Sequence, residues 1–104
     1  MSRIEAEKSV KKYIRKLQAE KFPFSAVYLF GSFAKNTFHK WSDIDVAVVS
    51  KEIDRDSEEG RKKLFQYTTG IDSRIEPHGF SPKDFKEDWR PMVHEIKTTG
   101  VRIK

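Results

Sequence analysis

Apolar positions recur at helical spacing near the start of the chain. This pattern predicts an amphipathic helix over residues 3–20, which the Phe-Pro-Phe sequence at 22–24 ends. The positions that carry the pattern are Ile4, Val10, Tyr13, Ile14 and Leu17.

Two short apolar runs bounded by turn residues predict strands over 25–30 and 44–49, and a short helix is expected to begin at Ser32 between them. A longer helix is predicted over 57–69, with Leu64 and Phe65 on its apolar side and Gly70 at its end.

Apolar and polar side chains alternate over residues 71–78, which predicts a half-exposed strand. Pro77 indicates that this strand lies at an edge of the sheet or ends there. Ser81 and Pro82 are typical of a helix start, a further helical stretch covers 91–98, and a last strand covers 101–103. Because helices alternate with strands, the fold class is α/β or α+β.

Length and composition narrow the class of protein. The chain has 104 residues, enough for one domain over 1–104 with a modest core. It contains no apolar run near the ~20 residues of a membrane span, and its first residues do not resemble a secretory signal. Cysteine is absent, which excludes disulfides and cysteine-bound zinc. We therefore expect a cytoplasmic protein without a membrane partner.

The net charge of +5 favours anionic partners without selecting one. The densest basic clusters, at 11–12 and 61–63, have acidic residues close by, which is typical of solvated helix faces. A nucleic-acid partner is therefore unlikely on sequence grounds.

Two aspartates open the second predicted strand. Asp43 and Asp45 are two residues apart, so their side chains are expected on one face. Paired carboxylates repel each other unless a cation lies between them, and Mg²⁺ is the usual cation beside phosphates. The pattern predicts a metal site where this apolar strand begins.

Gly31 and Ser32 directly follow the first predicted strand. A glycine here permits a sharp turn and close approach to a ligand, and the N–H groups of a helix beginning at Ser32 would suit a phosphate. A phosphate-binding loop beside a metal-binding strand supplies two components that phosphoryl or nucleotidyl transfer requires.

Gly-Ser, ten residues and then Asp-Ile-Asp resembles the motif of DNA polymerase β-type nucleotidyltransferases, and most closely the minimal, antitoxin-like nucleotidyltransferases. Gly31, Ser32, Asp43 and Asp45 match the motif. The resemblance covers residues 25–49 closely and the remainder by element order. It implies a mixed β-sheet flanked by helices.

The resemblance also implies a third carboxylate on a later strand, for which Glu76 is the candidate and Asp72 the reserve. Three carboxylates would hold up to two Mg²⁺ with ATP as substrate, and Glu76 would accept the proton of the acceptor hydroxyl. Relatives usually carry Gly at the position of Asn36, which of all other residues best adopts positive φ. Glu in place of the more common Asp would displace the third carboxylate and weaken the metal site.

Four further side chains are secondary candidates. Lys35 would reach a phosphate, although an exposed loop lysine is more often only solvated. Ser42 would contact nucleotide or cap the turn before the aspartates. Trp41 would stack on a base or pack within its loop. His78 shares the face of Glu76, although a lone strand histidine is usually structural.

Larger family members carry a second domain that 104 residues cannot accommodate. The resemblance therefore implies a small helical, HEPN-like partner protein, whose tyrosine would receive AMP, and pairing of two copies along the strand at 101–103 is the other route. The alternatives are a non-catalytic module that binds nucleotide or a partner, and a basic nucleic-acid-binding domain.

Overall fold

The computed structural model describes residues Met1 to Lys104 and contains one four-stranded mixed sheet. Strand β1 is antiparallel to β2 and to β4, and β2 is parallel to β3, in the order β3-β2-β1-β4. This confirms the expected mixed sheet flanked by helices. The elements are α1 (Arg3–Ala19), β1 (Ala26–Phe30), α2 (Ser32–Lys35), β2 (Ile44–Val49), α3 (Glu59–Gln66), β3 (Ile75–Phe80), α4 (Pro82–Phe85), α5 (Pro91–Thr99) and β4 (Val101–Arg102).

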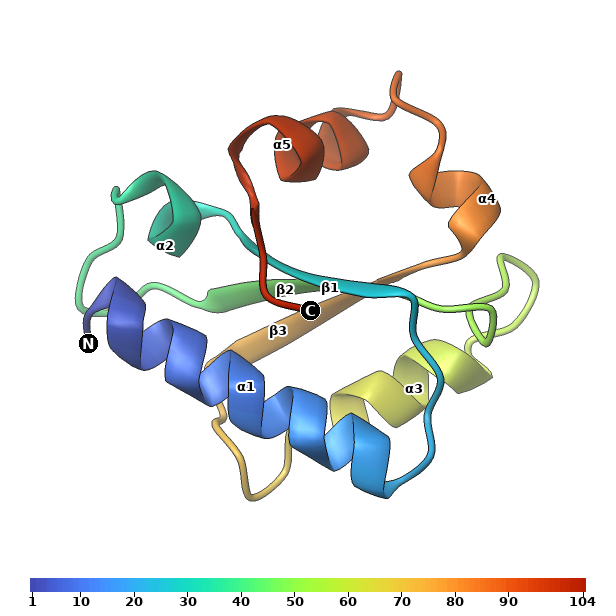
Figure 1. The fold of residues 1–104 in the computed structure, drawn as a ribbon, viewed down its shortest axis with the longest axis horizontal. Helices are drawn as coiled ribbons and strands as arrows, with labels where there is room; N and C mark the ends of the chain where they lie inside the picture. The colour runs from blue at the N-terminus through green and yellow to red at the C-terminus, as the bar shows by residue number, and fades with distance from the viewer.

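The helices form a layer on each side of the sheet. Figure 1 shows α1 and α3 against one face, and α4 and α5 over the other. The larger core lies under α1 and α3, and a smaller cluster of Phe30, Ala47 and Ile96 lies under α5. This smaller side of the sheet carries the polar residues described below.

Helix α1 forms as its apolar spacing predicts. The hydroxyl of Ser2 accepts a hydrogen bond from the Glu5 amide and caps the helix, and four of the five expected positions are buried. Ile4 is the exception: it is 67% exposed, and Ala6 faces the core in its place. At about 100° per residue, Ile4 lies on the side of α1 opposite Ala6, which is why it faces solvent.

The third strand begins later than the alternating pattern predicts. The strand expected over 71–78 is Ile75–Phe80, and Asp72 lies in the preceding turn. The Asp72 carboxylate accepts hydrogen bonds from the amide and guanidinium of Arg74 and from the hydroxyl of Ser9, so this side chain maintains the turn and ties it to α1. The alternation over 71–74 was therefore that of a turn.

Pro77 occupies the middle of the edge strand β3, so the first of the two expectations for this proline is confirmed. The carbonyls of Arg74 and Phe80 accept hydrogen bonds from the amides of Ile44, at the start of β2, and Ser50, just past its end. By alternation, the missing N–H of Pro77 faces the open edge, where no ladder bond is lost.

Helix α3 is shorter than the predicted 57–69 and spans Glu59–Gln66. Past Gln66, the amides of Thr68 and Thr69 bond to carbonyls three residues back, which tightens the chain out of the α-helix. Leu64 is buried as expected, but Phe65 is 66% exposed. Adjacent residues of a helix point about 100° apart, so the side of α3 that buries Leu64 leaves Phe65 outside the contact.

The final elements follow the sequence closely. The Ser81 hydroxyl accepts from the Asp84 amide and caps α4, with Pro82 in its first turn. Strand β4 contains only Val101 and Arg102, at the edge opposite β3. None of the helices has the length and apolar character that a bilayer span demands.

Candidate active site

Strand β2 positions Asp45 on the smaller side of the sheet. Its neighbours Ile44 and Val46 are fully buried in the larger core, so alternation directs the Asp45 side chain to the opposite face. The parallel register places Glu76 of β3 directly across from Asp45, and His78 across from Ala47. These acidic and basic side chains therefore share one face of two paired strands.

Asp45, Glu76 and His78 form a compact group, called here the acid–histidine group. One ligand atom from each lies within 4.8 Å of the others. The Nε2 atom of His78 is 3.4 Å from Oδ1 of Asp45 and 3.8 Å from Oε1 of Glu76. The side chains of Asp45 and His78 are 26% and 23% exposed, and that of Glu76 is 51% exposed. The group thus opens to solvent on the side of Glu76.

Gly31 closes this group from the side of β1. It is buried and adopts a φ of 75° as it leaves β1 for α2. A methyl group built on Gly31 would lie 2.2 Å from Oδ2 of Asp45. Only glycine permits both the positive φ and this close approach, so the Asp45 carboxylate fits between the Gly31 backbone and His78.

Asp43 is exposed just before β2 and lies outside the acid–histidine group. Its carboxylate nevertheless lies close enough to raise the pKa of Glu76. Burial raises the pKa of Glu76, and the Asp45 and Asp43 carboxylates raise it further, while His78 opposes them. The Asp43 and Asp45 carboxylates thus disfavour a negative charge on Glu76.

The turn after β1 contains the other predicted nucleotide-binding residues. Asn36 ends α2 with a φ of 57°, so it adopts the left-handed conformation expected of it. The Lys35 ammonium is 2.9 Å from the Glu95 carboxylate of α5 and ties the two helices together. A phosphate contact by Lys35 would therefore compete with this ion pair. Ser32 is half-buried at the first position of α2.

Ser42 stabilises the loop that leads into β2. Its side chain is buried, and its hydroxyl accepts a hydrogen bond of 2.8 Å from the His39 amide. This geometry favours the turn-capping role over a contact with nucleotide. Trp41 in the same loop is 78% exposed, and the Lys40 ammonium lies over its ring, 5.1 Å from the centroid. The Trp41 ring is thus accessible to an incoming molecule.

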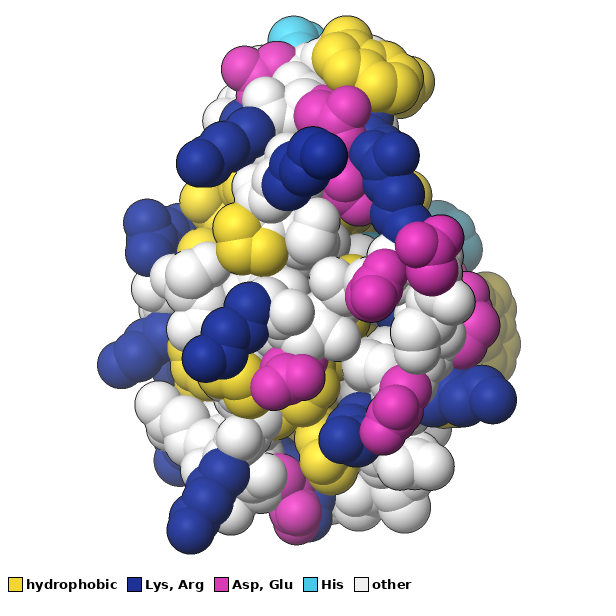
Figure 2. All heavy atoms as spheres, turned by 90° about the vertical axis from the view of Figure 1, so that its right-hand side faces the viewer, with side chains coloured by type: hydrophobic (Ala, Val, Ile, Leu, Met, Phe, Trp, Pro, Cys, Tyr) yellow, Lys and Arg dark blue, Asp and Glu magenta, His cyan; other side chains and the backbone are white.

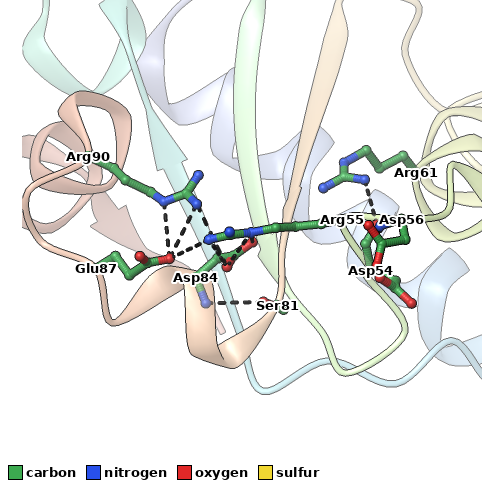
Figure 3. Close-up of polar contacts among 8 residues, drawn as sticks. All are labelled: Asp54, Arg55, Asp56, Arg61, Ser81, Asp84, Glu87 and Arg90. Atoms are coloured by element: carbon green, nitrogen blue, oxygen red, sulfur yellow. Dashed lines mark hydrogen bonds and ion pairs between the residues drawn. The ribbon is translucent and has the colours of Figure 1, made fainter.

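A second polar cluster, called here the Arg55 cluster, lies at the other end of the sheet and comprises Arg55, Asp84, Glu87 and Arg90 (Figure 3). Arg55 lies in the loop after β2 and binds both carboxylate oxygens of Asp84, at 2.8 Å from Nη2 and 3.2 Å from Nε. Its Nη2 also lies 2.7 Å from Glu87. Hydrogen bonding to Arg55 lowers the pKa of Asp84. These carboxylates already have cationic partners.

The surface around this second cluster mixes charges of both signs. On the face in Figure 2, Lys and Arg side chains are interspersed with Asp and Glu. A continuous basic stripe is the usual footprint of nucleic-acid binding. This face therefore gives no support to a nucleic-acid-binding domain.

His78 is the site residue to which sequence reasoning gave too little weight. Its spacing of two from Glu76 was the available signal, because it places both side chains on one strand face. The sequence does not reveal the parallel register of β2 and β3, which brings Asp45 opposite Glu76. That pairing converts an isolated histidine into the neighbour of two carboxylates.

The donor set fits a divalent cation. Carboxylate oxygens bind Mg²⁺ and Mn²⁺, and imidazole nitrogen binds transition metals. Two carboxylates converge beside a glycine that leaves space for them, and their mutual repulsion is opposed only in part by His78. Asp45 and Glu76 would hold the ion, and Asp43 and His78 offer further donor atoms beside them.

Comparison with known proteins agrees with this geometry. A model of the nucleotidyltransferase domain family matches residues 8–97. A toxin–antitoxin crystallised with AMP-PNP is 25% identical over 94% of this chain and 72% of its own, with a TM-score of 0.64. No curated protein gives a match.

Two further structures show the fold alone. A candidate nucleotidyltransferase from Sulfolobus solfataricus is 23% identical over 98% of this chain and 86% of its own, with a TM-score of 0.66. A complex of the tri-AMPylated Shewanella oneidensis HEPN toxin with its MNT antitoxin gives 21% identity over 98% and 71%, with a TM-score of 0.54.

Proposed function

Because the chain belongs to the nucleotidyltransferase domain family, we propose that it transfers AMP from ATP to a hydroxyl group of a small helical, HEPN-like partner protein, with Mg²⁺ at Asp43, Asp45 and Glu76. The observation that carries this proposal is the register of β2 and β3, which sets Asp45 opposite Glu76 beside the Gly31 turn. A nucleotidyl-transfer site needs carboxylates and a phosphate-accepting loop in this arrangement.

The proposed reaction forms one bond at the α-phosphorus of ATP and breaks another. The acceptor oxygen forms a bond to the α-phosphorus of ATP, and the bond from that phosphorus to the bridging oxygen of the β-phosphate breaks. Pyrophosphate leaves with the electron pair. Bound Mg²⁺ would neutralise charge on the phosphates.

The chain's own residues bind and orient the reactants in this proposal. The Gly31 and Ser32 backbone would contact the phosphates, and Asp45 is held at a fixed position between Gly31 and His78. The proton of the acceptor hydroxyl would pass to the Glu76 carboxylate. The 51% exposure of the Glu76 side chain leaves its carboxylate accessible to a hydroxyl group of a second protein.

The similar structures support the choice of nucleotide and partner. One neighbour is a toxin–antitoxin with AMP-PNP, an ATP analogue, and another is an antitoxin bound to an AMPylated HEPN toxin. The exposed aromatic ring of Trp41, in the loop before Asp43, supports a contact with the base or with the partner protein.

The test is transfer of label from ATP labelled at the α-phosphate to candidate helical partners in Mg²⁺. The full chain is compared with the Asp43→Asn/Asp45→Asn double variant. We expect loss of about 100-fold or more of labelling, because removal of residues even outside the first coordination shell costs about 10–100-fold at metal sites. Asp56→Asn is the matched control, since Asp56 is exposed in the loop after β2.

Equal labelling by the wild type and the double variant would overturn the proposal. Saturable ATP binding without labelling of any partner would instead favour the non-catalytic nucleotide-binding module of the same fold. A fluorescence titration with an ATP analogue measures that binding directly. Sedimentation analysis in the same buffer tests pairing of two copies along β4.

A further inference from the structure

We propose that His78 is a metal ligand together with Asp45 and Glu76, and that this nitrogen donor makes the site select divalent transition-metal ions over Mg²⁺. The inference rests on the proposed function, because it concerns the ion of the same site. It departs from an all-carboxylate set by assigning a coordination role to an imidazole.

The separations within the group fit ligands of a single ion. Metal–ligand bonds of about 2.0–2.2 Å place neighbouring ligand atoms about 3 Å apart in an octahedral site. His78 Nε2 lies 3.4 Å from Asp45 Oδ1 and 3.8 Å from Glu76 Oε1, and the three ligand atoms all lie within 4.8 Å of one another. An ion bound among them requires only small movements of side chains.

The same distances show that His78 makes no short hydrogen bond to either carboxylate. A charge-assisted hydrogen bond between imidazole and carboxylate is about 2.7–2.9 Å long. At 3.4 Å, the contact between His78 and Asp45 is longer than such a bond, although its nitrogen faces the carboxylate.

The surroundings hold the imidazole toward the two carboxylates. Its ring packs edge-on against Phe30, with centroids 5.2 Å apart and planes at 67°. Phe30 is also the β1 residue that pairs with Asp45, so one buried aromatic side chain adjoins both His78 and Asp45. Ala47, opposite His78 on β2, is small and leaves the imidazole space to lean toward Asp45.

Donor chemistry then determines the choice of ion. Mg²⁺ binds oxygen ligands in near-ideal octahedral geometry, whereas imidazole favours transition metals. Mn²⁺ accepts both carboxylate oxygen and imidazole nitrogen, and it also accepts phosphate oxygens. Two carboxylates plus one imidazole therefore favour Mn²⁺ over Mg²⁺ at this position.

The experiment is a titration of the full chain with Mn²⁺ alone and with Mg²⁺ alone, followed by pulsed EPR of the bound Mn²⁺. The variant His78→Gln replaces the imidazole with a neutral side chain that offers an oxygen. His94→Gln is the matched control, because His94 is exposed on α5.

We expect nitrogen modulation from a directly bound imidazole in the wild type and in His94→Gln, and its loss in His78→Gln. The Mn²⁺ dissociation constant of His78→Gln should rise about tenfold or more, at least the cost of removing an outer-shell partner. The Mg²⁺ dissociation constant should change much less. Absent modulation in the wild type, or modulation that survives in His78→Gln, overturns the inference.

The outcome is separable from that of the proposed function. Nitrogen modulation without nucleotide transfer in either metal would overturn the proposed function and support the ligand assignment. Transfer in Mg²⁺ that the double aspartate variant abolishes, without nitrogen modulation of bound Mn²⁺, would overturn the ligand assignment alone.

Discussion

Two regions of the molecule gather acidic side chains, and they differ in what neutralises them. In the Arg55 cluster, a guanidinium binds both oxygens of Asp84, and the pKa of Asp84 is lowered. In the acid–histidine group, the carboxylates face each other and His78, and the pKa of Glu76 is raised. In the first region, the Arg55 guanidinium neutralises the carboxylates. In the second region, His78 offsets the repulsion on Glu76 only in part.

This difference separates a structural use of carboxylates from a binding use. The Arg55 cluster joins the loop after β2 to the segment of α4 and α5, which are remote in sequence. The acid–histidine group lies on two strands that the sheet already pairs, so its charges are not needed to hold these strands together. Repulsion retained where no fold requires it indicates a site for an external cation.

The largest expected effect comes from filling the space beside Asp45. Gly31→Ala places a methyl group 2.2 Å from Oδ2 of Asp45, so the carboxylate must move. We expect the affinity for Mn²⁺ to fall about 100-fold, in the upper part of the range for disturbed metal sites. Calorimetric titration of the full chain measures it.

Gly70→Ala isolates the backbone contribution to that effect. Gly70 has a φ of 81°, close to that of Gly31, and a methyl group there meets no atom within 4 Å. Gly70→Ala should lose about 1–2 kcal/mol of folding stability because of its positive φ, and Gly31→Ala should lose at least as much, because its methyl group also meets the Asp45 carboxylate. If both also lose metal affinity equally, the close approach to Asp45 has no role.

Removal of the carboxylate charge in the Arg55 cluster should reduce stability. For Asp84→Asn we expect the melting temperature at pH 7 to fall by about 5 °C or more, because Arg55 loses its bidentate partner. The folded-state pKa of Asp84 is lowered, so its contribution is complete above the ordinary pKa and disappears as the pH falls through the folded-state pKa. Thermal unfolding across pH 2–7 measures the effect.

The exposed Asp56→Asn variant is the comparison for that series. It should unfold like the wild type at each pH. A stability difference between wild type and Asp84→Asn that stays constant down to pH 2 would show that the charge of Asp84 is not its cause.

The opposite sign is expected in the acid–histidine group. In metal-free buffer, Glu76→Gln should raise the melting temperature by about 1–3 °C, because a repelled carboxylate is removed. The folded-state pKa of Glu76 is raised, so the gain is present at neutral pH and disappears as the pH falls below its ordinary pKa. Saturating Mn²⁺ should reverse the order of the two proteins. A destabilised variant without metal would show that the two regions do not differ.

The smallest effect is expected for the ion pair of Lys35 and Glu95. Like the Arg55 cluster, this pair contains its own cation, but it lies next to the Gly31 turn. If Lys35 contacts a phosphate, Glu95→Gln should lower the ATP dissociation constant about two- to threefold, since exposed ion pairs contribute about 0–1 kcal/mol. Lys35→Gln should raise the same constant. Identical ATP affinity in all three proteins would leave Lys35 as a link between α2 and α5.

Local patterns predicted the fold well where one residue type decides the conformation. Asn36 adopts its positive φ, and Ser81 and Pro82 begin α4 as expected. The sequence failed where a side chain stabilises a turn with the same alternation as a strand. Asp72 is such a case, because its bonds to Arg74 and Ser9 depend on α1 lying nearby.

The residues of the candidate site also divide into those that local patterns predict and those that depend on the tertiary fold. Gly31, Asp45 and Glu76 follow from spacing and resemblance, and the structure places them side by side. The role of His78 depends on which strand pairs with β2 and in what register, and no local pattern contains that information. Lys35 and Ser42 have protein partners in the structure that only the tertiary fold provides.

The proline within β3 also sets a limit on assembly. Pro77 has no amide to donate to a further strand at the outer edge of β3. Addition of a strand from another chain is therefore disfavoured beside the carboxylates. The edge of the sheet nearest Glu76 therefore disfavours strand pairing between copies, while the Glu76 side chain remains open to solvent.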